Sequence, residues 1–334
     1  MAPEQMAKGG TRLKPGLAAC NLHHWMLNHQ EIIENNKLYF CTLGGFLIYK
    51  LTGRHACHIT NAAPTGFVDL TKLAWNPDII CAVGCADFIF PDILHEHEVC
   101  GYFSSSYGNI PVFPDIGDHQ ASVYGALGGL EEMAVISGGT AGIVSVVSKE
   151  STPGDHENRP YFNHCYLKTV TQLPGGRNLD VLIDFIEDIG KSIYDVSRNR
   201  EDIWRSVTST ILNTTNNDNI SDVLQVELGF FQGQQGVKHG RIDDIRPGNF
   251  TVGSLFMAAY ENMADIYITA LHKLTGSTVP IKKIILTGGS IHDNLFMKET
   301  IQKRSGIETI PSIVQNQELA GLLQLASKIN SEHG

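Results

Sequence analysis

The sequence has no run of 18 or more apolar residues, and Met1–Gly10 lacks the apolar core of a signal peptide. A membrane-spanning helix needs about 20 predominantly apolar residues, and a secretory signal needs an apolar run of roughly 7–15. These absences predict a cytoplasmic protein without a membrane partner. The net charge of -10 also argues against nucleic acid as a partner, because such complexes depend on basic patches.

The seven cysteines are odd in number and scattered, with no Cys-Xaa-Xaa-Cys spacing. They predict reduced thiols and no disulfide framework, as is usual in the cytoplasm. The stretch His95–Cys100 alternates its side chains as one face of a strand would, but no second cluster of ligands accompanies it. We therefore expect an exposed polar edge there and no metal site.

The length and composition are those of a globular protein that is large enough for two domains, with 334 residues, 42% hydrophobic and 18% charged. Apolar residues at helical spacing predict helices over 43–51, 179–194, 201–212 and 251–274. The first of these is apolar on most sides, so we expect it to be buried, with Gly53 as its C-cap. Residues 102–109 and 151–178 are polar and are expected to form loops.

The first candidate for chemistry lies in the stretch Pro111–Leu127. A short apolar run ends at Gly117-Asp118, and a helix rich in small residues begins at about Gln120. An Asp at a strand-to-helix junction has two interpretations. It can be an N-cap that accepts backbone N–H groups, or a carboxylate that such donors keep ionised and ready to take a proton.

A second candidate is the small-residue tip Ser137–Gly142, which two β-branched runs flank in the manner of a β-hairpin. Gly138-Gly139-Thr140 carries no bulky side chain, so successive N–H groups can form a nest for phosphate, and Thr140 adds a hydroxyl. A tight turn that requires positive φ explains the same glycines. The residues alone leave both interpretations open.

A third candidate is the loop Gly288-Gly289-Ser290, which follows a buried strand from about Lys282 and precedes a helix from about Asp293 to Lys303. This order is compatible with nucleotide binding, because a helix N-terminus attracts phosphate. No Gly-Lys-Ser/Thr follows the loop, so it is not a Walker A loop. It also lacks the Gly-Xaa-Gly-Xaa-Xaa-Gly of dinucleotide-binding oxidoreductases.

In this order the three features resemble the FGGY family of carbohydrate kinases, most nearly the sedoheptulokinases. Asn61–Asp69 is similar to a family stretch of the form Ser-Asn-Ala-Ser, Thr-Gly-Xaa-Xaa-Asp, and Gly117–Ser122 resembles the family's Gly-Asp-Xaa-Gln-Ala motif. The resemblance implies an α/β fold of the actin-like, ribonuclease-H-like ATPase type. It implies two domains, with residues 1–128 on the substrate side and 129–334 on the ATP side. A homodimer is the default expectation for assembly.

The resemblance also implies an enzyme that uses ATP and Mg²⁺ to phosphorylate a hydroxyl of a small-molecule sugar or polyol, for example the ketose sedoheptulose. Asp118 would be the general base, and His119 and Gln120 would touch the sugar. The residues implied for ATP are Gly138, Gly139 and Thr140 at the phosphates, with Gly288, Gly289, Ser290 and Asn294 at the adenosine.

Three departures from the family pattern favour an alternative. The Asp-Xaa-Gly-Thr/Ser motif with which these kinases open is not found in the sequence. Gly236-Val237-Lys238 stands in place of Gly-Glu-Arg, and Ser137 stands in place of Asn. We therefore expect the first domain to be incomplete. The alternative function is a catalytically degenerate homologue or fragment that binds a ligand or partner without turnover.

Overall fold

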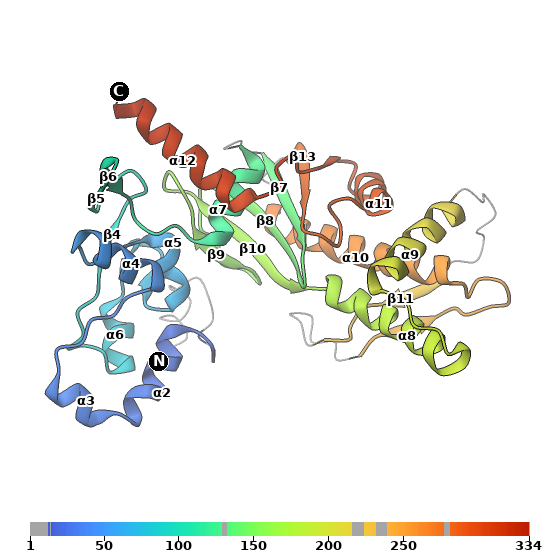
Figure 1. Cartoon of the computed structure of the whole chain (residues 1–334), viewed down its shortest axis with the longest axis horizontal. Helices are drawn as coiled ribbons and strands as arrows, with labels where there is room; N and C mark the ends of the chain where they lie inside the picture. Colours follow the sequence, from blue (N-terminus) through green and yellow to red (C-terminus); the bar gives the residue numbers. More distant parts are fainter. Residues whose placement is uncertain are drawn as a thin grey trace. The chain divides into compact units, whose positions relative to one another are not determined.

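The computed structural model describes residues 13, 15–128, 132–215, 224–231, 239–276 and 281–333. The chain forms two compact units (Figure 1). Unit 1 contains residues 1–129, 147–168 and 314–334, and unit 2 contains residues 130–146 and 169–313. Among the described residues, no helix has the length and apolar character needed to cross a bilayer.

Unit 1 is built from short helices and very short strands. Its helices are α2 (Ala18–Leu27), α3 (Gln30–Asn35), α4 (Leu43–Thr52), α5 (Ile59–Ala62), the 3-10 helix η1 (Ala63–Thr65), α6 (Pro77–Val83), α7 (Asp118–Leu127) and α12 (Gln317–His333). Its strand pairs are the parallel pair β1 (Ala56–His58) and β4 (Asp92–Leu94), and the antiparallel pairs β2 (Val68–Asp69) with β3 (Ala74–Trp75) and β5 (Gly101–Ser105) with β6 (Gly108–Val112).

The hydrophobic core of unit 1 is divided. Its buried apolar side chains fall into separate small clusters, one around Phe67 and Ile79, one around Val68 and Leu70, and one around Ile48. Each small cluster buries little apolar surface. Hydrogen bonds between the segments therefore contribute more to holding this unit in a single structure.

Helices α7 and α12 of unit 1 approach each other at backbone distance (Figure 1). A Cβ on Gly125 of α7 would overlap the carbonyl of Gln317, and a Cβ on Gly321 of α12 would overlap the carbonyl of Ala121. Glycine is therefore required at both positions by close approach. This contact fixes the helix whose first residue is Asp118.

A six-stranded mixed sheet has the order β14-β13-β7-β8-β10-β9. The central strand β13 is parallel to both of its neighbours, and β7 and β8 form an antiparallel hairpin. The strands are β7 (Met133–Gly138), β8 (Gly142–Ser148), β9 (Glu157–Pro160), β10 (Tyr166–Leu173), β13 (Lys283–Thr287) and β14 (Glu308–Pro311). A short antiparallel pair, β11 (Gln225–Glu227) and β12 (Arg241–Asp243), lies outside it.

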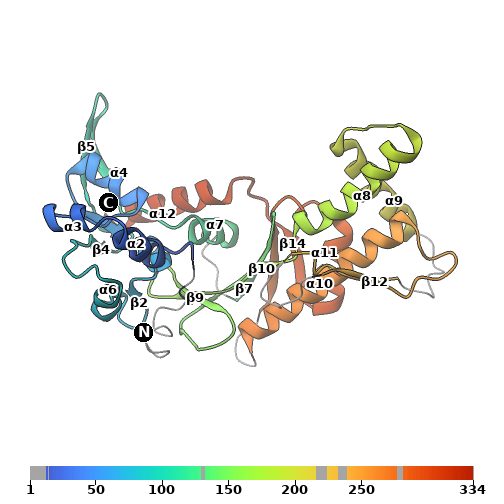
Figure 2. The same ribbon diagram turned by 90° about the horizontal axis from the view of Figure 1, so that it is seen from below.

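The helices of unit 2 share one continuous core with β7, β8, β10 and β13. They are α8 (Gly176–Tyr194), α9 (Arg200–Thr215), α10 (Val252–Thr275) and α11 (Leu295–Ser305). Helix α10 packs against both α9 and α11, as Figure 2 shows. Fully buried Phe256, Met263 and Tyr267 of α10 join Ile136 of β7 and Leu286 of β13 in this core.

Most of the predicted elements of unit 2 are confirmed. The small-residue tip joins two antiparallel strands, and helices occupy the predicted stretches 179–194, 201–212 and 251–274. The loop expected over 151–178, a stretch that belongs partly to each unit, is wrong, because β9, β10 and the start of α8 lie there.

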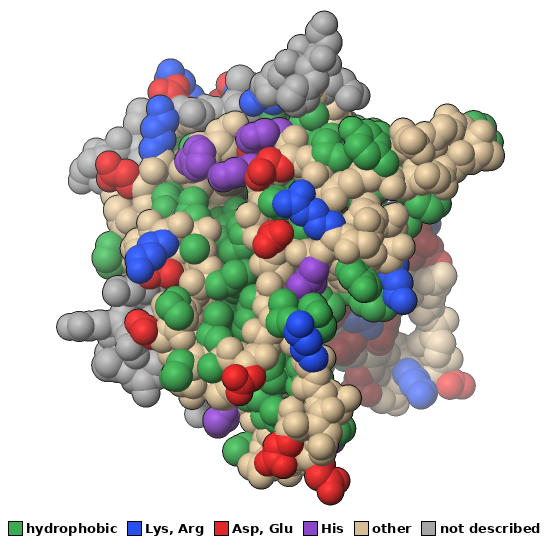
Figure 3. All heavy atoms as spheres, turned by 90° about the vertical axis from the view of Figure 1, so that its left-hand side faces the viewer, with side chains coloured by type: hydrophobic (Ala, Val, Ile, Leu, Met, Phe, Trp, Pro, Cys, Tyr) green, Lys and Arg blue, Asp and Glu red, His purple; other side chains and the backbone are tan. Residues whose placement is uncertain are grey.

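Two expectations for unit 1 are wrong. Helix α4 ends at Gly53 as predicted, but it is not buried: Leu43 is 87% exposed and Leu47 is 58% exposed, and apolar side chains lie open on this face of unit 1 (Figure 3). Strands β1 and β4, which lie beside α4, have only three residues each. They cover only the face of α4 that carries Ile48. Residues 102–109, expected to form a loop, belong to the exposed hairpin β5–β6.

Candidate active site

Asp118 is the first residue of α7, and Gly117 is the N-cap. The N-cap interpretation of Asp118 is therefore wrong. Its Oδ1 accepts a hydrogen bond from the backbone N–H of His119 at 2.6 Å, and the side chain is exposed. The positive end of the helix dipole stabilises a carboxylate in this first turn. The structure thus presents an accessible carboxyl group at the start of a helix that α12 holds in place.

The segment that leads to Asp118 is anchored by Asp115, which sequence reasoning missed. One carboxylate oxygen of Asp115 accepts from Thr42 Oγ1 at 2.7 Å and from Asn61 Nδ2 at 2.9 Å, and the other accepts from His58 N at 2.9 Å. Thr42 is also the N-cap of α4. Asp115 therefore joins α4, the end of β1 and α5 to the segment before α7. The signal was present in the sequence as an Asp two residues before the Gly117-Asp118 pair.

His119 and Gln120 have different surroundings. Burial lowers the pKa of His119 to about 4, and the charge of Arg159 lowers it further against the opposing effect of Asp118. The imidazole is therefore neutral at pH 7. Gln120 is buried, and its Nε2 donates to the carbonyl of Pro160 at 3.2 Å. Sugar contacts by these two residues stay predictions.

The hairpin tip of unit 2 lies against the start of α8. The backbone N–H of Gly176 donates to the carbonyl of Gly139 at 2.8 Å, and that of Arg177 donates to the carbonyl of Thr140 at 3.2 Å. A Cβ on Gly175 would come within 2.7 Å of the backbone of Ala141. The tip and the helix start thus meet at backbone distance, a contact that sequence reasoning missed.

The Gly288 loop contacts the same tip. Both the backbone N–H and the Oγ of Ser290 donate to the carbonyl of Gly138, at 2.9 and 2.7 Å. Gly288 has φ +83°, and a Cβ there would lie 2.6 Å from the Gly138 backbone. The structure therefore brings together the two glycine turns that are about 150 residues apart in the sequence.

These turns contain glycines of two kinds. Gly138, Gly175 and Gly288 are closed, because a Cβ would collide with neighbouring atoms of the protein. Gly139 and Gly289 are open: a Cβ at Gly139 has one neighbour at 3.9 Å, and at Gly289 it has none within 4 Å. The first kind is needed for the turns to pack, and the second leaves space beside the backbone for a ligand.

Asn294 is the N-cap of α11, where its Oδ1 accepts from Met297 N at 2.9 Å. It also hydrogen-bonds the hydroxyl of Tyr260, whose pKa burial raises to about 12. The adenine contact predicted for Asn294 stays a prediction. The residues Gly236-Val237-Lys238, which replace the expected Gly-Glu-Arg, lie outside the described part of the chain.

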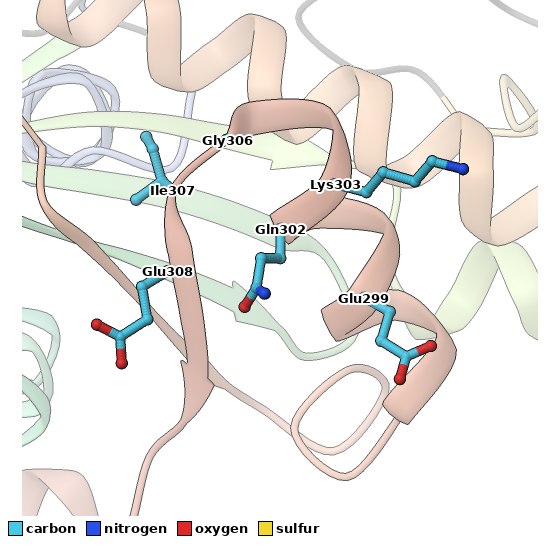
Figure 4. Close-up of a pocket in the computed structure, with 6 residues that line it drawn as sticks. All are labelled: Glu299, Gln302, Lys303, Gly306, Ile307 and Glu308. Atoms are coloured by element: carbon cyan, nitrogen blue, oxygen red, sulfur yellow. The ribbon is translucent and has the colours of Figure 1, made fainter.

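A hollow of about 480 Å³ lies at the other end of α11 (Figure 4). It is lined by Glu299, Gln302, Lys303, Gly306, Ile307 and Glu308. Asn294 and the glycine loop lie at the N-terminal end of this helix, and the hollow lies at its C-terminal end. The hollow is therefore separate from the turns around Gly138, Gly175 and Gly288.

The histidine-rich stretch after β4 is a turn, and the strand expected there is wrong. Strand β4 ends at Leu94, and the backbone N–H of Glu98 donates to the carbonyl of His95 at 3.1 Å. His95 stacks on His97, with ring centroids 5.8 Å apart, and meets His164 edge to face at 5.3 Å. Over the part of the chain that the structure describes, no group of three or more His, Cys, Asp or Glu side chains is placed to hold a metal ion.

Part of the chain is similar in sequence to known proteins. The model of the N-terminal domain of the FGGY family of carbohydrate kinases matches residues 2–125. A glycerol kinase from Thermococcus gammatolerans is 32% identical over 147 residues, which are 42% of this chain and 30% of that protein. Residues 2–125 are therefore similar to the N-terminal domain of the FGGY family of carbohydrate kinases.

Solved structures of FGGY-type sugar kinases share the fold. A xylulose kinase from Rhodospirillum rubrum matches 97% of this chain and 66% of its own, with a TM-score of 0.81 and 15% identity. A Plasmodium falciparum glycerol kinase with ADP matches 98% of this chain and 68% of its own, with a TM-score of 0.77 and 15% identity. The predicted α/β, actin-like ATPase fold is confirmed. The chain spans under a third of the length of the curated relative from Thermococcus.

Proposed function

We propose that this protein is an FGGY carbohydrate kinase that transfers the γ-phosphate of ATP to a hydroxyl of a sugar or polyol, with a ketose such as sedoheptulose among the acceptors. The observation that carries the proposal is that three glycine-containing turns, around Gly138, Gly175 and Gly288, meet at one place in unit 2. Their closed glycines let the backbones touch, and their open glycines leave room beside N–H groups. Such an arrangement suits a nucleotide, whose phosphates bind backbone N–H groups at turns and helix starts.

On the acceptor side, Asp118 would act as the general base. It is exposed, it sits at a helix start, and its segment is fixed by Asp115 and by the contact between α7 and α12. In phosphoryl transfer most of the catalytic effect comes from positioning and charge stabilisation, so a rigidly placed carboxylate has the property that the reaction needs. Neutral His119 next to it would be able to donate to or accept from a sugar hydroxyl.

On the nucleotide side, the N–H groups around Gly139 and Thr140 would face the phosphates, and the open side of Gly289 would lie against the adenosine. Mg²⁺ would arrive with ATP, since this ion usually binds through phosphates, water and one or two carboxylates. The described residues offer no cluster of three metal-binding side chains, so the protein's share of that binding would be small. Homodimer formation and a cytoplasmic location also stay predictions.

The proposal is tested by two substitutions that act on different halves of the reaction. Asp118→Asn is expected to keep ATP binding and to lower ADP release in the presence of acceptor by at least 10²-fold, within the range of general-base catalysis. Gly289→Val is expected to abolish ATP binding without lowering the thermal unfolding temperature, because its side chain would enter open space. ATP binding is measured by calorimetry, and turnover by a coupled ADP assay against glycerol, xylulose, gluconate and sedoheptulose.

The alternative is a degenerate homologue that binds a ligand or a partner without turnover, and the missing Asp-Xaa-Gly-Thr/Ser motif favours it. ATP binding that is lost in Gly289→Val, together with no transfer to any acceptor by the unmodified chain, would support this alternative. Transfer that survives in Asp118→Asn would instead show that another group is the base.

A further inference from the structure

A continuous chain of hydrogen bonds in unit 1 ends at the residue before Asp118. The backbone N–H of Gly117 donates to Thr60 Oγ1 at 2.9 Å. Thr60 Oγ1 lies 2.7 Å from His58 Nδ1, and His58 Nε2 lies 3.4 Å from Glu96 Oε2. Glu96 is in the turn after β4, so the chain connects that turn to the N-cap of α7.

The donors along this chain have one consistent direction. His58 Nδ1 accepts from the backbone N–H of Thr60 at 3.3 Å, so this ring nitrogen carries no proton. Nε2–H is then the donor to Glu96, and the hydroxyl of Thr60 is the donor to Nδ1. Thr60 Oγ1 is left as the acceptor for Gly117. Each hydroxyl or ring in the chain thus uses one side to give and the other to receive.

The chain is buried along most of its length. His58 is 1% exposed and Thr60 is fully buried. Burial opposes ionisation of Glu96, but hydrogen bonds from His58 and from the backbone N–H groups of Glu96 and Asn163 outweigh it and lower the pKa of Glu96 to about 2. Glu96 is therefore a fixed negative end for the chain. Its Oε1 accepts from Asn163 N at 3.1 Å, which ties in the turn that follows β9.

We propose that Glu96, His58 and Thr60 are positioning residues for Asp118, and that they set the direction of its carboxylate by fixing the Gly117 N–H. The inference rests on the proposed function, in which Asp118 is the base. Glu96, His58 and Thr60 do not touch the reacting atoms themselves. Gly117 has no side chain that could hold it in place, so its backbone hydrogen bond to Thr60 helps to fix its position.

The test removes the hydroxyl of Thr60 and restores it. Thr60→Val keeps the shape of the side chain but leaves the Gly117 N–H without its acceptor, and Thr60→Ser keeps the hydroxyl. We expect kcat to fall about 10–100-fold in Thr60→Val, with the KM for ATP unchanged, and to return to within about threefold in Thr60→Ser, the size expected for a group that orients a reacting residue.

The matched control is Thr65→Val. Thr65 is a buried threonine of the same segment, and its hydroxyl donates to the carbonyl of Ala62, outside the chain. This variant is expected to lose as much thermal stability as Thr60→Val and to keep the kcat of the wild type. Equal losses of kcat in both valine variants would show that the effect of Thr60 is only structural and would overturn the inference.

Two readouts separate this inference from the proposed function. Amide exchange followed by NMR reports Gly117 without any turnover, and it is expected to be at least tenfold faster in Thr60→Val than in the wild type. In the Asp118→Asn background, Thr60→Val is expected to have no further effect on the remaining rate. An unmodified chain without transfer activity overturns the proposed function, whereas full activity in Thr60→Val overturns the inference alone.

Discussion

The carboxylate of Glu96 gives the structure a specific dependence of stability on pH. Its pKa is about 2 in the folded protein and 4.5 ordinarily, because its hydrogen bonds to His58 and Asn163 favour the ionised form more than burial disfavours it. A carboxylate with a lowered pKa stabilises the folded state above its ordinary pKa and loses that stabilisation as the pH falls through the folded value. The loss is therefore expected between pH 4.5 and about 2.

The magnitude follows from the two pKa values. A tenfold change in proton affinity corresponds to about 1.4 kcal/mol, so the difference between 4.5 and about 2 amounts to about 3 kcal/mol of unfolding free energy. Glu96→Gln does not titrate, so it lacks this contribution. Between pH 4.5 and 2 the wild type is expected to lose about 1.4 kcal/mol per pH unit more than the variant.

The measurement is urea unfolding at pH 5.5, 4.5, 3.5 and 2.5 with tryptophan fluorescence as the signal. Of the three tryptophans, Trp25 and Trp75 lie in unit 1 and Trp204 lies in unit 2. A Trp204→Phe background therefore reports the unfolding of unit 1 alone. Glu34→Gln, which removes an exposed carboxylate of α3 in unit 1, is the control for the loss of a charge. Parallel pH profiles for wild type and Glu96→Gln would refute the reasoning.

Two further predictions concern α7. Gly125→Ala is expected to lower the free energy of unfolding by about 1–3 kcal/mol, because its Cβ would overlap the carbonyl of Gln317; an unchanged urea midpoint would contradict the close contact of α7 with α12. His119 has a pKa of about 4 against 6.5 ordinarily, so the folded state resists its protonation and wild-type stability is expected to fall as the pH drops from 6.5 to 4. His119→Gln should have a flatter profile over that range, and an equally steep one would argue against burial of the ring.

The order of the site elements could be predicted from the sequence because each is a local pattern. The Gly-Asp before α7, the glycine tip between β7 and β8, and the strand, glycine loop and helix of 283–305 were all located by residue type and spacing. Glycines mark turns and close approaches whatever surrounds them, so they were visible without the fold.

The packing of those elements could not be predicted, since it depends on contacts between distant residues. The helix over 43–51 is apolar on most sides, yet Leu43 and Leu47 are exposed, because apolarity shows what a helix can bury and not whether a partner is present. Asp115 was missed for a related reason. Its role arises from Thr42, His58 and Asn61, which only the folded chain brings to it.

The sequence by itself determined the family resemblance, the fold class and the position of Asp118, because these follow from local motifs in a fixed order. Only the tertiary structure decided that Gly117, and not Asp118, caps α7, and that Gly138 and Gly288 touch. It also decided that Glu96 lies at the end of a hydrogen-bonded chain to Gly117. The physical reason is the separation along the sequence of the residues that interact. A cap or a turn is set by neighbouring residues, whereas a buried polar chain needs several segments to be in place at once.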